Sequence, residues 1–154
     1  MISLIAAIDD KKGIGKLGTI PWSLSEDDNR FEDLTKNHTI IMDAHRFEAF
    51  GKALEHRKNI VVTQDPNFTS EGVIVVNTIE EAIGEAGGGE IFVIGGAQIF
   101  NQTIEYADKI YLTHVEGDFG CDSFFPDYSQ FANEVFIGAG QENNIKYKFL
   151  ELTK

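Results

Sequence analysis

The chain has 154 residues, of which 42% are hydrophobic and 25% are charged. This composition excludes a disordered chain and predicts one domain, residues 1–154, with a substantial core. The formal net charge of −12 argues against binding to nucleic acid or to an anionic membrane surface, because both would be repelled.

The first segment, residues 2–8, is apolar without alternation, which is typical of a strand buried on both faces. It lacks the basic start of a signal peptide, and no apolar run reaches the length of a membrane span, so we expect a cytoplasmic protein. Residues 9–24 follow as a glycine-punctuated loop, and a loop of this length is typical of a lid or a binding loop.

The helix predicted near residues 25–36 begins with three consecutive acids, and only one of them should face inward. Ser25 is the expected N-cap, because an acid follows it three residues later. At helical spacing Asp27 aligns with Phe31, whereas Glu26 and Asp28 point outward. An inward carboxylate is costly unless it is paired or protonated. Asp27 therefore either caps backbone N–H groups at the start of the helix or serves a function.

The remaining elements alternate between strands and helices until the tail. Strands are expected at 39–42, 58–63, 72–76, 91–94 and 109–115, with helices through 47–50, at 79–86 and through 99–104. Thr78 should cap the helix at 79–86, and the glycines from Gly87 should end it. Two tail strands, 134–140 and 145–152, have no helix between them and should pair antiparallel. This order predicts a single-domain α/β fold with a mostly parallel central sheet, helices on both faces and a C-terminal antiparallel hairpin.

Ligands of such sheets bind beyond the carboxyl ends of the strands. Two turns are candidates for a binding site there, one rich in glycine and one that carries charged residues. The junction at residues 95–98 joins a strand to a helix, so its free N–H groups either suit a phosphate or only make a tight turn. At the start of the short helix, His45 and Arg46 either hold a phosphate or are simply solvated, and Asp43 opposes an anion there.

A third candidate place is the surface around Asp27. Thr113 lies on a predicted strand, and its hydroxyl is a natural partner for a half-buried carboxylate. Trp22 is either plain core or a donor through its indole N–H. Arg57, just before a strand, is the best-placed cation for a ligand carboxylate unless it is merely exposed. A lone cysteine, Cys121, excludes an internal disulfide, and neither metal-ligand spacing nor a nucleophile elbow is present, so no metal site and no covalent catalysis are expected.

Taken together, these segments resemble dihydrofolate reductase along nearly the entire chain. The resemblance rests on Ile2–Ala7, Ile14-Gly15, Pro21-Trp22, Asp27 with Phe31, Arg57–Ile60, Val93–Gly96, Tyr111–His114 and Phe125–Tyr128. A Pro-Trp pair followed by an inward acid, with Ile-Gly-Gly later, is a specific combination. The resemblance implies a monomeric oxidoreductase that reduces 7,8-dihydrofolate to 5,6,7,8-tetrahydrofolate with hydride from NADPH. It also implies a role in one-carbon metabolism and tetrahydrofolate biosynthesis, and makes the protein an antifolate target.

The resemblance also implies roles for individual residues. Asp27 would bind the pterin and promote its protonation, Thr113 would support that carboxylate, and Trp22 would hold a water beside it. Arg57 would pair with the glutamate tail, and Ile94 and Phe100 would flank the nicotinamide, under a mobile loop at residues 9–24. The implied substrate-binding residues are Ile5, Ala6, Asp27, Phe31, Phe50, Leu54, Arg57, Ile94 and Thr113. The implied cofactor-binding residues are Ala7, Ile14, Ile20, His45, Arg46, Thr63, Gln64, Gly95, Gly96, Ala97, Gln98, Ile99 and Phe100.

The chain departs from the family at the start of its short helix. Asp43 stands where the family usually has glycine, and Ala44 where it usually has a basic residue for the cofactor 2′-phosphate. Gln64 is likewise neutral, and Arg46 restores only part of the charge. We therefore expect weakened discrimination against NADH. Two alternatives remain: a pterin- or nucleotide-binding homologue with little turnover, and a pyrimidine reductase of the flavin pathway, against which the intact Pro-Trp pair and inward acid argue.

Overall fold

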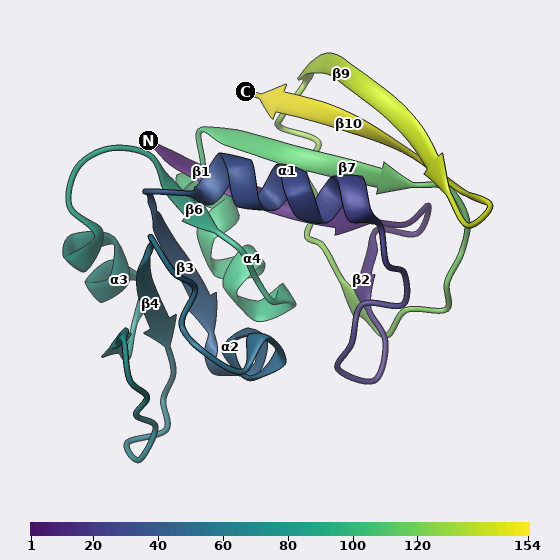
Figure 1. The fold of residues 1–154 in the computed structure, drawn as a ribbon. Helices are drawn as coiled ribbons and strands as arrows, with labels where there is room; N and C mark the ends of the chain where they lie inside the picture. Colours follow the sequence, from purple (N-terminus) through teal and green to yellow (C-terminus); the bar gives the residue numbers. More distant parts are fainter.

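The apolar segments of the sequence assemble into one eight-stranded sheet in the order β5-β4-β3-β6-β1-β7-β10-β9 (Figure 1). The computed structural model describes residues 1–154. Its strands are β1 Ile2–Ile8, β2 Gly13–Gly15, β3 Thr39–Asp43, β4 Lys58–Val62, β5 Val73–Val76, β6 Ile91–Val93, β7 Lys109–Val115, β8 Ser123–Phe124, β9 Asn133–Glu142 and β10 Ile145–Thr153. Its helices are α1 Ser25–Thr35, α2 Ala44–Phe50, α3 Ile79–Ala86, α4 Ala97–Thr103 and the 3-10 turn Ile104–Tyr106.

The sheet is parallel from β5 through β7 and antiparallel only at β10 and β9. Helices connect most of the parallel strands, and a crossover of this length is what parallel pairing requires. The hairpin β9–β10 turns at Asn143 and Asn144, which both have positive φ, as tight hairpin turns demand. The predicted α/β fold with its antiparallel tail is confirmed.

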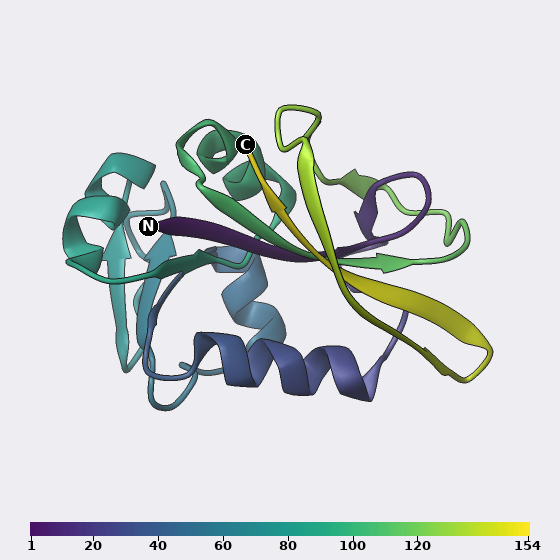
Figure 2. The ribbon, with the colours of Figure 1, turned by 90° about the horizontal axis from the view of Figure 1, so that it is seen from above.

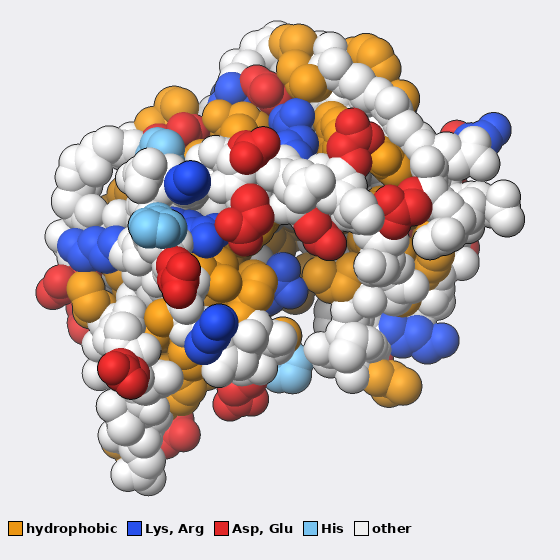
Figure 3. Space-filling view, viewed as in Figure 1, with side chains coloured by type: hydrophobic (Ala, Val, Ile, Leu, Met, Phe, Trp, Pro, Cys, Tyr) orange, Lys and Arg blue, Asp and Glu red, His pale blue; other side chains and the backbone are white.

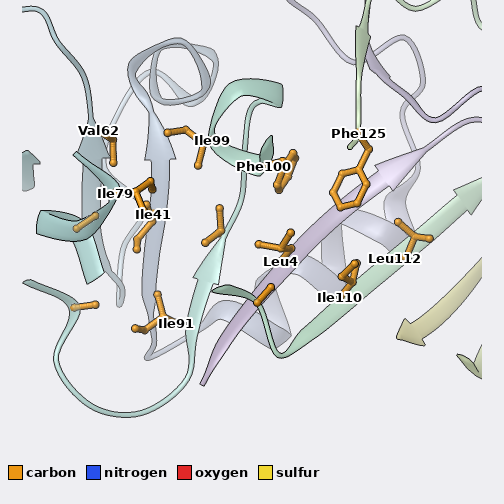
Figure 4. Close-up of a cluster of buried hydrophobic side chains, with 14 of the residues drawn as sticks. Leu4, Ile41, Val62, Ile79, Ile91, Ile99, Phe100, Ile110, Leu112 and Phe125 are labelled. Carbon is orange, nitrogen blue, oxygen red and sulfur yellow. The ribbon is translucent and has the colours of Figure 1, made fainter. Parts of the chain in front are cut away.

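Two helical layers cover the two faces of the parallel part of the sheet, whereas the edge strand β9 is largely exposed. Seen from above in Figure 2, α1 and α2 lie on one side of the strands and α3 and α4 lie on the other. Alternate residues of one strand serve the two layers: Ile41 packs with the α3 and α4 residues, whereas Ile40 and Met42 pack toward α2 and α1. Figure 4 shows the layer on the α3 and α4 side, where Leu4 and Phe100 lie near the centre. None of the helices is both long enough and apolar enough to cross a membrane.

The start of α1 is held by the tail of the chain and not by a local cap. Leu24 occupies the N-cap position without any side-chain cap, and Ser25 is already the first helical residue. The N–H of Ser25 donates to the two carboxylate oxygens of Glu142 at 3.1 and 3.3 Å. The predicted capping role of Ser25 is therefore wrong, because the hairpin β9–β10 supplies the acceptor. The local cap of α3 is confirmed, since Thr78 accepts from the N–H of Glu81 at 3.1 Å.

The loop at residues 9–24 contains a short strand that was not predicted from the sequence. Within it, β2 pairs antiparallel with β8, so this loop is tied to the segment after β7. Asp9 is only 1% exposed, and its carboxylate accepts from the N–H groups of Gly13 at 2.8 Å and Phe119 at 3.0 Å. Burial raises the pKa of Asp9, but hydrogen bonds from these N–H groups lower it by a larger amount. The pKa of Asp9 is therefore below its usual value, and the carboxylate is ionised.

Candidate active site

A cavity of about 350 Å³ opens between α1, α2 and the middle of the sheet. In Figure 3 the face that carries α1 is hollowed below that helix, with hydrophobic side chains in the walls. The walls come from β1, the loop before α1, α1 itself, α2 and the segment after it, the residue that follows β6, and the middle of β7. The cavity brings together many of the predicted site residues, namely Ile5, Ala6, Ala7, Ile20, Trp22, Asp27, Phe31, Arg46, Phe50, Leu54, Ile94 and Thr113.

Asp27 is the half-buried acid of this cavity. It lies in the first turn of α1, and Thr113 on β7 donates its hydroxyl to Asp27 Oδ1 at 2.5 Å. Thr113 is positioned by the register of β7 against β1, where it stands opposite Ala7. Burial raises the pKa of Asp27, and the hydrogen bond from Thr113 offsets only part of this rise, so the pKa of Asp27 is above its usual value. The group is thus suited to hold or release a proton closer to neutral pH than an exposed aspartate.

The two neighbouring acids differ from the helical prediction in one respect. Glu26 is exposed, and its Oε1 accepts from the hydroxyl of Tyr147 at 2.6 Å, which raises the pKa of Tyr147 to about 12. Asp28 is also largely exposed, yet it lines the rim of the cavity, and burial raises its pKa. The prediction that only Asp27 faces inward is therefore wrong in part, because the cavity extends around the flank of α1.

Arg46 brings a cation into the same cavity. It is the third residue of α2, and its guanidinium lies over the ring of Phe50, 4.7 Å from the ring centre. Burial lowers the pKa of Arg46, although Asp43, Asp28 and Asp27 each act to raise it. The guanidinium remains a cation, because its pKa starts far above neutral. Arg46 lines the same cavity as Asp27 and Asp28. Its role at a cofactor phosphate stays a prediction.

Asp43 occupies the junction between the starts of α2 and α4. Its Oδ1 accepts from the N–H of Arg46 at 2.7 Å, which caps α2, and its Oδ2 accepts from the N–H of Gly96 at 3.1 Å. The peptide bond between Gly95 and Gly96 is cis, and a Cβ on Gly95 would lie 3.1 Å from the ring of Phe100. One of the N–H groups expected to be free for a phosphate is thus already bonded to a carboxylate of the chain.

Several predicted cofactor residues lie outside the cavity. Ile99 and Phe100 are each 3% exposed, and their side chains lie in the core on the α4 side (Figure 4). Gln64, beyond the end of β4, donates its amide N–H to the carbonyl of Asn77. The ring of His45 lies against Gly18 of the loop at residues 9–24. The remaining predicted residues outside the cavity lining are Ile14, Thr63, Gly95, Gly96, Ala97 and Gln98.

The side chain of Arg57 is not exposed, and its guanidinium is already paired with groups of the chain. Its side chain is 6% exposed, and Nη2 lies 3.0 Å from Glu32 Oε2. Nη1 donates to the hydroxyl of Thr35 at 3.2 Å, and Nε donates to the carbonyl of Glu55 at 2.9 Å. Glu32 lines the cavity and Arg57 does not. This pairing was not predicted from the sequence, since two oppositely charged residues 25 positions apart give no local signal.

Comparisons with known proteins agree over the full length of the chain. The family described as dihydrofolate reductase matches residues 1–154. The dihydrofolate reductase of Bacillus subtilis is 37% identical over 160 residues, covering 100% of this chain and 95% of that protein. The Staphylococcus aureus enzyme is 34% identical over 157 residues, covering 99% and 98%. A solved dihydrofolate reductase from Enterococcus faecalis, complexed with NADP(H) and RAB-propyl, superposes with a TM-score of 0.88 at 29% identity, covering 99% of this chain and 95% of that one.

Proposed function

The chain belongs to the dihydrofolate reductase family, and we propose that it reduces dihydrofolate in the cavity around Asp27. The enzyme is an NADPH-dependent oxidoreductase whose product is tetrahydrofolate. The observation that carries the site assignment is the single half-buried carboxylate, bonded to Thr113 and set among apolar walls. A flat pterin ring fits such walls, and a carboxylate at their end offers an acceptor to its amino and ring N–H groups.

Asp27 is the proposed catalytic residue. Reduction of the pterin needs one proton besides the hydride that NADPH supplies when it is bound. A carboxyl group whose pKa is raised by burial favours protonation of a ring that it holds. Thr113 is a positioning residue, because its hydroxyl fixes one oxygen of Asp27. Trp22 also lines the cavity and packs edge-on against Phe119, with 5.1 Å between ring centres.

The proposed substrate site follows the same cavity from Asp27 toward Leu54. Phe31 from α1 and Phe50 from α2 stack at 6.1 Å between ring centres, and both line the cavity. These apolar walls suit the benzoyl part of the substrate. Arg57 lies beyond Glu32 at this end of the cavity and is the proposed partner of the glutamate tail.

The proposed cofactor site lies at Gly95, Gly96 and Ala97. None of the three has a side chain longer than a methyl group, so a pyrophosphate can approach the backbone closely. Asp43 opposes this fit, because its carboxylate already holds the N–H of Gly96. Ala44 adds no cation for a 2′-phosphate. We therefore propose that the enzyme discriminates weakly between NADPH and NADH. Comparable specificity constants for the two cofactors would support this proposal, and a strong preference for NADPH would refute it.

We further propose that the enzyme acts as a cytoplasmic monomer built from one domain. One sheet takes strands from both the first and the last residues of the chain. Sedimentation of the purified protein tests the monomer, and a stable dimer at micromolar concentration would refute it.

The test of the proposed function is dihydrofolate-dependent oxidation of NADPH by the purified protein. The parent enzyme should oxidise NADPH only when dihydrofolate is present, and Asp27→Asn should lose most of this activity. Asp33→Asn is the matched control, because Asp33 lies on the same helix but is exposed and lines no part of the cavity. Tight antifolate binding without cofactor oxidation would instead identify a pterin-binding protein with little turnover.

A further inference from the structure

The cation proposed for the substrate tail is already paired with an acid of the chain. Glu32 is the eighth residue of α1 and stands in the wall of the cavity, between the cavity and Arg57. Its side chain is 55% exposed, whereas that of Arg57 is 6% exposed. Figure 3 shows acidic side chains along α1, with basic ones beside the C-terminal end of the helix. A ligand carboxylate coming from the cavity therefore meets Glu32 before it meets Arg57.

We propose that Glu32 competes with the substrate tail for Arg57, and that it thereby sets how strongly the enzyme selects substrates with a tail carboxylate. This inference rests on the proposed role of Arg57. It adds a residue that acts against binding of the tail. The selectivity of the enzyme then depends on the difference in binding free energy between two carboxylates, that of the tail and that of Glu32, for one guanidinium.

The partners of the three guanidinium nitrogen atoms of Arg57 indicate at which atom the tail carboxylate replaces Glu32. Nε donates to a backbone carbonyl, that of Glu55, and Nη1 donates to the hydroxyl of Thr35, which is 0% exposed. Those two acceptors are fixed by the backbone and by burial, so they orient the guanidinium by themselves. Glu32 is the mobile partner, because its side chain is largely in solvent and can leave Nη2 without losing a buried environment. The tail carboxylate therefore takes the position of Glu32 on Nη2.

The expected size of the effect is modest, because an exposed acid forms a weak ion pair. Releasing Arg57 from Glu32 and removing the repulsion between two carboxylates should together strengthen tail binding by about three- to tenfold. The gain belongs to binding and not to the chemical step, so it should appear in KM while kcat is unchanged. The KM of a substrate without tail carboxylates should not change.

The experiment compares Glu32→Gln with the parent on two substrates. One is dihydrofolate, and the other is its diamide, in which both tail carboxylates are replaced by neutral amides. We expect Glu32→Gln to lower KM for dihydrofolate by about three- to tenfold and to leave KM for the diamide unchanged. Asp33→Asn, the neighbouring exposed acid, removes the same charge from the helix and controls for the overall field of the protein. Its KM values should equal those of the parent.

Arg57→Met separates failure of this inference from failure of the tail assignment. If Arg57 holds the tail, Arg57→Met raises KM for dihydrofolate but not for the diamide, and Glu32→Gln has no further effect in that background. If Arg57→Met changes neither KM, the proposed role of Arg57 is wrong. If Arg57→Met raises KM but Glu32→Gln alone leaves it unchanged, the competition is refuted. If Glu32→Gln raises KM for dihydrofolate, Glu32 orients Arg57 and the inference is overturned.

Discussion

Replacing Asp27 with asparagine removes a charge from the cavity while it keeps the shape of the side chain. The amide oxygen can still accept the hydroxyl of Thr113, so the positioning contact survives. The variant loses a group that favours protonation of the pterin, and such acid–base groups contribute about 10²–10⁴-fold in rate. It also loses a charge-assisted hydrogen bond to the protonated ring, worth about 1.5–3 kcal/mol. Because the two losses overlap, we expect kcat/KM for dihydrofolate to fall about 100- to 1,000-fold at neutral pH.

The same substitution should stabilise the fold at neutral pH. Burial raises the pKa of Asp27, so the folded protein binds this proton more tightly than the unfolded chain does. The stability that the group contributes is therefore complete below its ordinary pKa of 3.8 and is lost as the pH rises through the raised value. Asparagine has no charge to bury. Asp27→Asn should melt at a higher temperature than the parent at neutral pH, and the difference should shrink in acid.

The assay for this prediction follows NADPH oxidation at saturating NADPH, alongside thermal melts across the same pH range. Asp33→Asn is again the matched control, since Asp33 is exposed on the same helix, and it should change neither quantity. Unchanged turnover of Asp27→Asn at neutral pH would refute the catalytic assignment. A variant that melts below the parent at neutral pH would refute the reasoning from burial, whatever its activity.

Three further perturbations test other parts of the structure. Asp43→Gly should tighten NADPH binding by about three- to tenfold in a fluorescence titration, because the N–H of Gly96 is released, and an unchanged Kd would contradict this. Arg46→Met should move the acid limb of the kcat/KM profile to higher pH, because its guanidinium acts to lower the pKa of Asp27. A limb that stays in place would contradict that reasoning. Leu4→Ala should reduce the free energy of unfolding in urea by about 2–5 kcal/mol, because Leu4 is 0% exposed. A loss well below this range would show that the core collapses into the space left by the leucine side chain.

The features predicted well from the sequence are those that depend on nearby residues. The cap at Thr78 works over three positions, and the buried strands follow from continuous β-branched runs. The start of α1 was predicted wrongly because its acceptor, Glu142, lies 117 residues away from Ser25. The pairing of Arg57 with Glu32 is similarly non-local. Periodicity indicates which face a residue occupies, but it carries no information on which distant group comes within hydrogen-bond distance.

Asp28 and Arg46 show a second limit, which concerns shape. A helical projection divides residues into inward and outward sets, as though a helix met a flat core. Here α1 lies over the rim of a cavity, so its flank as well as its inner face borders the site, and Asp28 is on that flank. Arg46, in the first turn of α2, lines the same cavity. The ring of Phe50, one turn further along the same helix, draws its guanidinium toward the cavity.

The pairing of cations near the cavity explains how so acidic a chain accommodates an anionic substrate. A net charge of −12 gives no long-range attraction for such a ligand. Yet Arg57 is held by Glu32, and Arg46 lies close to Asp43 and Asp28, so neither cation is bare before a ligand arrives. When a ligand carboxylate replaces an acid of the chain, the cation stays paired throughout, and this exchange avoids the cost of stripping water from an isolated charge. The apolar walls can then supply most of the binding free energy, while the acids of the chain decide which anions are accepted.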